Sequence, residues 1–228
     1  MATSTSIDVE LHSHTLFSRD SLNRIDDVIR TCRAIGIDRI AITDHNQIDG
    51  ALQAKLLAPD LVIVAEEVKT RDGELLCLFI HELIPRGLAS EEVIERAHMQ
   101  GGIVGVPHPL DPMRSGLGRE NILRLRDKLD FIEVFNARTH DRSKNKAAGE
   151  LARELGLCGS TGSDAHTLRE IGTCRVRMRN YAPDSVSDFL AALQGAILYT
   201  RTASPLVHLS SRWASAVHRL GLYRAVDH

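Results

Sequence analysis

The chain has 228 residues, of which 43% are hydrophobic and 25% are charged, and its formal net charge at pH 7 is −2. This is the composition of an ordinary globular domain with a full core, and no apolar run reaches the roughly 18 residues that a membrane span needs. The near-neutral charge and an aromatic content of 4% exclude the basic track and the stacking platform that a long nucleic acid requires.

The first part of the chain alternates apolar runs with a helical pattern. Apolar side chains recur at helical spacing from Ile25 to Ile35, and Gly36 ends this pattern. The pair Asp72-Gly73 indicates a turn, after which Glu74 opens an apolar run over 75–80. We therefore expect strands at 7–11, 39–42 and 61–65 and helices at 25–35 and 49–57.

The second part of the chain continues the alternation. Ser90 is the expected N-cap of a helix over 91–100, which Gly101 and Gly102 end. Further strands are expected at 103–106, 131–135, 157–161, 174–178 and 196–200, and further helices at 120–129, 143–155 and 185–194. A linker-like stretch at 201–205 then divides the chain into a barrel domain, 1–203, and an amphipathic, partly helical tail, 204–228.

Strands and helices alternate six or seven times, which indicates an α/β fold with parallel strands joined by helices. An open sheet of this kind would gather its functional residues at one switch point. Here histidines and carboxylates follow almost every expected strand, and this favours a closed barrel with its site at the C-terminal face of the strands.

The cysteines give an expectation about the compartment. The four cysteines are scattered among apolar neighbours, and no two of them form a Cys-x-x-Cys pair. This pattern is typical of buried free thiols in a reducing environment. The cysteines are Cys32, Cys77, Cys158 and Cys174. Residues 1–6 carry neither the basic nor the apolar region of a signal peptide. We therefore expect a cytoplasmic protein.

The functional signal is a set of imidazoles and carboxylates at or just after strand ends. His12 and His14 are separated by one residue, so on a strand both rings point to the same face. The full set is His12, His14, Asp20, His45, Glu67, Glu74, His108, Asp164 and His166. Nitrogen and oxygen ligands without a thiolate suit Zn, Mn or Fe, and the set is too large for one tetrahedral ion. We expect two or three divalent ions bridged by carboxylate and hydroxide.

Such a multi-metal site suits the hydrolysis of a phosphate ester. Metal ions lower the pKa of a bound water so that hydroxide forms near neutral pH, and they neutralise the oxyanion during in-line displacement. Phosphate-ester hydrolysis needs both effects because its uncatalysed rate is among the slowest known.

Four motifs in the chain carry a resemblance to a known family. They are His12-Ser13-His14, Thr43-Asp44-His45-Asn46, Pro107-His108-Pro109 and Gly162-Ser163-Asp164-Ala165-His166. Over roughly residues 7–200 the sequence resembles the PHP (polymerase and histidinol phosphatase) family. The resemblance implies a distorted (β/α)7 barrel, up to three Zn, Mn or Fe ions, and in most cases phosphoesterase activity.

The family's metal ligands match His12, His14, Asp20, His45, His108, Asp164 and His166. The acidic ligand of the family usually stands in Gly-x-Glu-x-Ser/Thr, from which the stretch at 65–70 departs, and we choose Glu67 over Glu66. Glu74 stands where the family often has histidine, with His81 as the competing candidate.

Five further residues are candidates for an assisting role. Asp44 is expected to orient a metal-binding side chain by contacting it, without binding the metal itself. Arg19 and Arg138, like Arg114, lie in loops expected on the site face, where a guanidinium suits bidentate binding of phosphate. His140 follows a strand end and either donates a proton to the leaving group or lies on the rim.

The function that these residues predict is the hydrolysis of a small phosphomonoester, of the nucleotide bisphosphate or histidinol phosphate kind, or of a short oligonucleotide end. One alternative is an amidohydrolase-like attack on a C–N or C–O bond by the same hydroxide. Another is a metal-stabilised domain without enzymatic activity. Cationic side chains in the pocket would favour the phosphoesterase. No membrane partner is expected, and the oligomeric state is left open.

Overall fold

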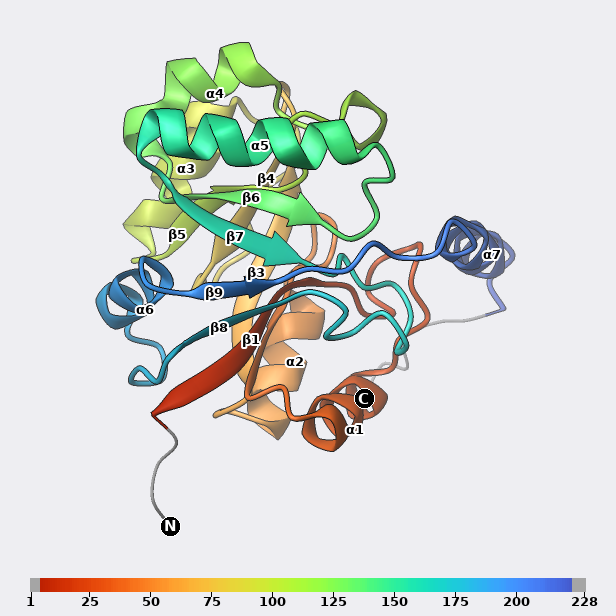
Figure 1. Ribbon diagram of the computed structural model, residues 1–228. Helices are drawn as coiled ribbons and strands as arrows, with labels where there is room; N and C mark the ends of the chain where they lie inside the picture. The colour runs from red at the N-terminus through yellow and green to blue at the C-terminus, as the bar shows by residue number, and fades with distance from the viewer. Residues whose placement is uncertain (1–4, 223–228) are drawn as a thin grey trace.

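One mixed sheet dominates residues 5–222, the part of the chain that the computed structural model describes. Its strands are β1 (Ser6–Ser13), β2 (Arg39–Ile42), β3 (Val62–Lys69), β4 (Glu74–Leu78), β5 (Ile103–Val106), β6 (Phe131–Asn136), β7 (Cys158–Gly162), β8 (Arg175–Arg179) and β9 (Ile197–Tyr199). They lie in the order β7-β6-β5-β4-β3-β2-β1-β8-β9 and curl into a nearly closed barrel (Figure 1).

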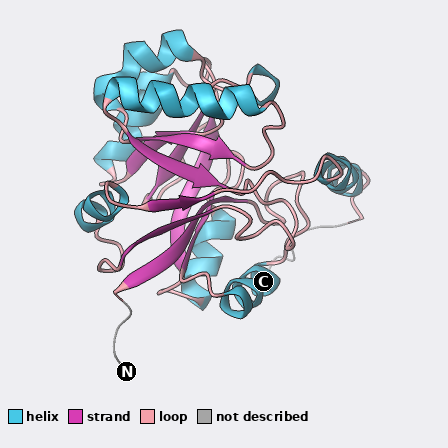
Figure 2. Cartoon of the chain, in the orientation of Figure 1, coloured by secondary structure: helices cyan, strands magenta, loops and turns pink. Residues whose placement is uncertain are grey.

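The helices surround this sheet, as Figure 2 shows. They are α1 (Ile25–Ile35), α2 (Asp49–Leu57), α3 (Ser90–Met99), α4 (Arg119–Leu125), α5 (Arg142–Leu155), α6 (Val186–Leu193) and α7 (Val207–Arg219), with short 3₁₀ turns η1 (Pro112–Arg114) and η2 (Arg126–Lys128). None of the helices within residues 5–222 is long and apolar enough to cross a membrane.

The barrel closes at the end where the parallel strands finish. There the backbone N–H of Ala165, just beyond β7, donates to the His12 carbonyl at 3.2 Å, and the His14 N–H donates to the Ala165 carbonyl at 2.9 Å. The segment after β7 therefore lies against the end of β1 and brings its side chains to those of His12 and His14. The expected distorted (β/α)7 barrel is confirmed.

Strand direction differs from the expectation of parallel strands throughout. β4 runs antiparallel to both β3 and β5, and β8 runs antiparallel to β1. The reason for β4 is the short connection 70–73, since a parallel crossover needs about a dozen residues or more. Thr70 closes this turn, because its Oγ1 donates to the Gly73 carbonyl at 2.8 Å.

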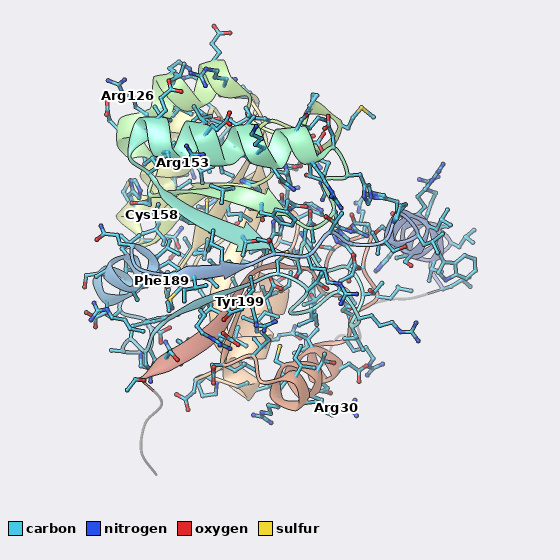
Figure 3. The ribbon with its side chains drawn as sticks, viewed as in Figure 1. Arg30, Arg126, Arg153, Cys158, Phe189 and Tyr199 are labelled. Atoms are coloured by element: carbon cyan, nitrogen blue, oxygen red, sulfur yellow. The ribbon has the colours of Figure 1, made fainter. Side chains whose placement is uncertain are left out.

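Apolar side chains fill the barrel and the layer between sheet and helices. Val9, Leu11 and Phe131 belong to the interior cluster. The ring of Phe131 covers Gly105, where an added Cβ would lie 2.1 Å from it. Phe189 of α6, labelled in Figure 3, is fully buried, so α6 closes one end of this cluster.

Local differences from the expected elements concern boundaries. β3 continues to Lys69, so Glu66 and Glu67 lie within a strand instead of after one. Ser90 is not the N-cap of α3: Ala89 has that position, and the Ser90 hydroxyl lies 2.8 Å from that of Thr70. The single helix expected over 120–129 is α4 followed by η2.

The cysteines follow the expectation for free thiols with one difference. Cys32, Cys77 and Cys174 are buried and free, whereas Cys158 is free but only half-buried. Burial raises the pKa of the Cys32 thiol to about 12, which keeps it protonated.

Candidate metal centre

The end of β1 places two imidazoles in the barrel. The register between β1 and β2 shifts between Glu10 and Ser13. Leu11 packs in the interior cluster, and the ring of the next residue, His12, is still fully buried inside the barrel. Such a bulge adds one residue and turns the following side chains. The rings of His12 and His14 lie 5.2 Å apart between centroids, so the two side chains converge as their spacing predicts.

Glu67 lies at the centre of the cluster and is fully buried. Its Oε2 lies 2.9 Å from His45 Nδ1 and 3.3 Å from His12 Nε2. Its Oε1 lies 3.1 Å from His108 Nε2. One carboxylate thus contacts imidazoles from three different segments, which is the position of a bridging ligand.

The neighbouring carboxylate, Glu66, points out of the barrel. Its Oε2 accepts a hydrogen bond from the Ile84 N–H at 3.0 Å, and burial raises its pKa to about 7. Alternation along β3 therefore puts Glu67, and not Glu66, among the candidate ligands.

The antiparallel direction of β4 distinguishes Glu74 from His81, the two residues that compete for one ligand position. Because β4 runs against its neighbours, its first residue, Glu74, lies at the site end, with Oε2 3.8 Å from His108 Nε2. His81 comes three residues after the end of β4 and is exposed at the opposite end of the barrel, where its N–H donates to Gln100 Oε1 at 2.8 Å. Geometry therefore places Glu74 in the cluster and removes His81 from it.

The loop after β7 supplies a carboxylate and an imidazole. Asp164 Oδ1 lies 3.4 Å from His14 Nε2. His166 Nε2 lies 3.0 Å from Asp20 Oδ2, and His45 Nε2 lies 3.6 Å from the same oxygen. All nine residues predicted as ligands are thus brought together.

Backbone strain marks two of these strand ends. His108 and Asp164 have φ angles of 29° and 52°, in the left-handed region that residues other than glycine rarely adopt. A strained backbone at a cluster of polar side chains is typical of a functional site.

The donor set fits divalent cations. Within residues 5–222 the candidate ligand atoms form four overlapping groups, each within 4.8 Å: His14, His45 and His166; His12, His108 and Asp164; His12, His14 and Glu67; and Glu67, Glu74 and His108. The buried atoms His14 Nε2 and Asp164 Oδ1 have no hydrogen-bond partner among residues 5–222, since the 3.4 Å that separates them is longer than a good hydrogen bond. A cation would satisfy both atoms, because buried polar groups need a partner.

Glu67 and His14 have protonation states that suit metal binding, whereas, although burial opposes it, the nearby carboxylates raise the pKa of the His12 and His45 rings. Burial opposes ionisation of Glu67, but the imidazoles of His45 and His12 hold its pKa well below the usual range. Burial, followed by the neighbouring rings of His166 and His45, holds the pKa of His14 well below its usual value. An ionised carboxylate and a neutral imidazole are the forms that bind a metal ion.

A buried carboxylate that the sequence interpretation missed supports the cluster from behind. Glu133 of β6 lies 3.0 Å from His12 Nδ1 through Oε1 and accepts the His108 N–H at 2.7 Å through Oε2. Gly162 makes room for it, since a Cβ there would lie 2.1 Å from Glu133 Oε1 and 2.6 Å from His12 Cβ. The available signal was a lone acidic residue inside an apolar strand.

Asp44 lies behind the cluster. It accepts hydrogen bonds from the Thr15 N–H at 2.7 Å and from the Ser18 hydroxyl at 2.8 Å. Ser18 Oγ in turn lies 3.2 Å from His14 Nδ1 and accepts the His45 N–H at 3.0 Å. This is the position that an orienting role requires, and the role itself stays a prediction.

The arginines predicted to hold phosphate differ in their surroundings. Arg138 is buried, with Nη1 3.0 Å from His166 Nδ1 and Nε 2.9 Å from Glu170 Oε1, so its guanidinium already has protein partners. Arg19 is exposed and does not line the pocket above the cluster. Arg114 lines that pocket and pairs with Asp164. Phosphate binding by Arg19 and Arg138 stays a prediction.

A cavity of about 660 Å³ opens above the cluster. Candidate ligands line one side of it, and η1, the start of α5 and helix α7 line the rest. His140 is on this rim, with its Nε2 2.8 Å from that of His208 on α7. A volume of this size accommodates a small-molecule substrate.

Comparisons with known proteins agree with this geometry. The family model described as PHP domain matches residues 10–78, and the model described as PHP-associated matches residues 142–196. An uncharacterized protein of Methanocaldococcus jannaschii is 37% identical over 160 residues, which are 64% of this chain and 92% of that protein. A probable phosphatase of Caldicellulosiruptor bescii is 22% identical over 205 residues, which are 76% of this chain and 85% of that protein.

Solved structures share the fold. A two-domain protein of Bacteroides vulgatus that contains a predicted PHP-like metal-dependent phosphoesterase has a TM-score of 0.69 at 18% identity, over 86% of this chain and 65% of that chain. The lesion-specific endonuclease Q of Pyrococcus furiosus has a TM-score of 0.64 at 17% identity, over 85% of this chain and 57% of that chain. The chain thus spans less than two thirds of either structure. By its motifs, its barrel and its relatives, this chain belongs to the PHP family.

Proposed function

We propose that the protein is a metal-dependent phosphoesterase that hydrolyses a small phosphomonoester. The observation that carries the proposal is the cluster of imidazoles and carboxylates beneath the cavity, which includes buried atoms that a bound cation would satisfy. Metal ions bound there would supply a hydroxide near neutral pH and neutralise the charge on phosphate oxygens. The proposed ligands are the nine residues brought together at the barrel end.

The pocket lining favours a phosphate ester over a C–N or C–O bond. Four cationic side chains line the cavity: Arg114, Arg138 and Lys144, which are paired with Asp164, Glu170 and Asp111, and Arg212. Positive groups hold the non-reacting oxygens of a phosphate, whereas a neutral amide or lactone gains little from them. Retention of a complete candidate ligand set also argues against a domain that has lost catalysis.

A short oligonucleotide end is the second candidate substrate. Endonuclease Q shares the fold, which supports keeping this class in the test. Helix α7 forms a wall of the cavity, so a substrate of this kind would enter by its end. The number and identity of the ions, a proton-donating role of His140 and a cytoplasmic location stay predictions.

The test is phosphate release from a panel of phosphomonoesters and 5′-phosphorylated oligonucleotides with Mn²⁺, Zn²⁺ or Fe²⁺. We expect release from at least one compound, loss of release after chelation and recovery when metal is restored. An amide and lactone panel under the same conditions is the control. Metal-dependent hydrolysis of that panel alone would overturn the proposal.

A further inference from the structure

Helix α7 carries a stripe of apolar side chains that the barrel does not cover. Its N-cap Leu206 and its C-cap Leu220 both have a right-handed helical backbone, so the helical pattern runs from one to the other. Leu206, Leu209, Trp213 and Leu220 are between 60% and 71% exposed. No other helix within residues 5–222 exposes more than two large apolar side chains. α7 also lies at the edge of the molecule, where a partner can reach it (Figure 1).

The spacing of this stripe is that of a helix-pairing seam. With the half-buried Ala216 included, its residues follow one another at intervals of three, four, three and four. This is the alternation of the a and d positions of a heptad, which face a second helix. Such a stripe is narrower than the apolar face with which a helix covers a core. We call these residues the α7 seam: Leu206, Leu209, Trp213, Ala216 and Leu220.

Contacts to the barrel hold another side of α7 and keep the seam at the surface. Arg138 Nη2 donates to the Val207 carbonyl at 2.9 Å, and His218 Nε2 lies 3.0 Å from the Ser21 carbonyl. Ala214, between these two contacts, is buried. Rotation of the helix about its axis would break both contacts, so the seam has a fixed position.

A cavity of about 520 Å³ continues the seam towards the barrel. Leu209 and Trp213 line it from α7, and Leu22 and Leu168 line it from the loops after β1 and β7. The apolar surface therefore extends beyond the helix itself. A side chain of a second helix that lies along the seam can enter this cavity.

The apolar area of this surface is of the size that a stable dimer needs. The exposed side chains of the seam leave roughly 500 Å² of apolar area in water. The walls of the adjoining cavity add to this area. A stable interface takes about 800 Å² from each partner. The seam and the cavity thus supply most of an interface to which two copies contribute the same surface.

The order of large and small side chains favours an antiparallel pair. About a twofold axis just beyond Trp213, such a pair sets Trp213 of each copy against Ala216 of the other and Leu209 against Leu220. Large side chains that face small ones fill the space between two helices. A parallel pair would instead set the two copies of Trp213 against each other.

We propose that the protein forms a homodimer through the α7 seam, with the two α7 helices antiparallel. A second copy then covers the apolar stripe and fills the cavity beside it. The dimer leaves another face of α7 open, where His208, Ser211 and Ser215 line the cavity above the candidate metal centre. This inference does not depend on the proposed phosphoesterase function.

Charge on one edge of the seam distinguishes a second copy from other partners. Arg212 and Arg219 lie on the same edge, each directly before a seam residue, and residues 201–222 contain no carboxylate side chain. In the antiparallel pair, Arg212 of one copy approaches Arg219 of the other. Salt screens this repulsion, so the dimer should tighten as the salt concentration rises. An acidic protein or an anionic lipid surface would instead bind α7 more weakly at high salt.

The test is sedimentation equilibrium of the full chain at micromolar concentrations, in low and in high NaCl. We expect a monomer–dimer equilibrium for the wild type. Trp213→Ala should raise the Kd of the dimer at least about 30-fold, the usual effect of losing a central aromatic anchor. Alanine keeps the helix and the exposed position tolerates it, which an unchanged Tm confirms.

Two further variants make the outcome specific. Leu56→Ala removes a leucine of α2 that is 84% exposed, and it should leave the association unchanged. Arg219→Glu should tighten the dimer about tenfold at low salt, because the new carboxylate approaches Arg212 of the other copy on both sides of the axis. A folding defect cannot produce a tighter dimer.

A wild-type chain that stays monomeric throughout, or a dimer that Trp213→Ala leaves intact, would overturn the proposal. A dimer that Arg219→Glu does not tighten would overturn the antiparallel arrangement. Flotation with phosphatidylglycerol vesicles measures the competing occupant. Binding of a monomeric chain to these vesicles, if Trp213→Ala abolishes it, would assign the seam to a lipid surface and refute the dimer.

Discussion

Two adjacent glutamates on β3 show that a difference of one position along a strand decides whether a side chain reaches the candidate metal centre. Glu67 contacts four imidazoles inside the barrel, whereas Glu66 contacts the Ile84 N–H outside it. Successive side chains of a strand point to opposite faces, so chemically identical neighbours meet entirely different surroundings.

Glu67→Gln and Glu66→Gln therefore form a matched pair. We expect Glu67→Gln to lose at least one bound ion and to lower turnover by more than about 100-fold, because the amide is a weaker ligand than the carboxylate. Glu66→Gln should keep both, since its amide oxygen still accepts the Ile84 N–H. Metal analysis and phosphate release give the readouts. Loss of metal from Glu66→Gln alone would contradict the assignment.

At the scale of elements, ion pairs join β8 to β1 in addition to the backbone hydrogen bonds. Asp8 faces Arg177 in the antiparallel register, with Oδ1 2.7 Å from Nε and Oδ2 2.7 Å from Nη2. Arg175 Nε donates to the same carboxylate at 3.1 Å. Figure 3 labels Tyr199 of β9, over whose ring both guanidinium groups lie.

This contact predicts a pH-dependent stability. The hydrogen bond from Arg177 lowers the pKa of Asp8 despite the opposing effect of burial. Stability from the ionised carboxylate is therefore complete above the ordinary pKa of an aspartate and is lost as pH falls through the lowered value. Asp8→Asn should lower the free energy of unfolding by about 1 kcal/mol at pH 7. Urea denaturation should show this deficit shrinking as the pH falls below the ordinary pKa of an aspartate.

Asp60→Asn is the control, because Asp60 makes no ion pair or hydrogen bond within residues 5–222. A deficit of Asp8→Asn that stays constant from neutral to acidic pH would contradict the linkage.

How far the sequence predicts the site depends on which physical signal each residue carries. His12, His14, His45, His108 and Asp164 end apolar runs abruptly, and the structure brings them together. Glu74 was placed by motif comparison, because composition does not reveal that β4 runs backwards. Glu133 was missed because a buried carboxylate inside a strand looks like any interruption of an apolar run. The proximity of α7 to the cavity depends on tertiary contacts, which no local pattern encodes.

At the scale of the whole molecule, the cluster joins distant parts of the chain. Its candidate ligands come from β1, β3 and β4 and from the loops after β1, β2, β5 and β7. Cations bound among them would be held only in the folded state, so their binding free energy would add to the free energy of folding.

Metal ions should therefore stabilise the fold. At about 100 times the dissociation constant, one ion adds about 2.7 kcal/mol, which corresponds to a Tm increase of roughly 5–10 °C for a domain of this size. Differential scanning fluorimetry with Mn²⁺ or Zn²⁺, before and after chelation, measures the increase, and Glu67→Gln should show a smaller one. An unchanged Tm with every metal tried would argue against the candidate centre.

The missing side chain at Gly162 sets a limit on how such a protein diverges. Even the methyl group of alanine would overlap Glu133 and His12, so every substitution of Gly162 would displace side chains that support the candidate metal centre. At Gly149 on α5 an added Cβ meets nothing closer than 3.9 Å. Descendants of this chain can therefore drift in their outer helices while one codon beneath the imidazoles stays closed to variation.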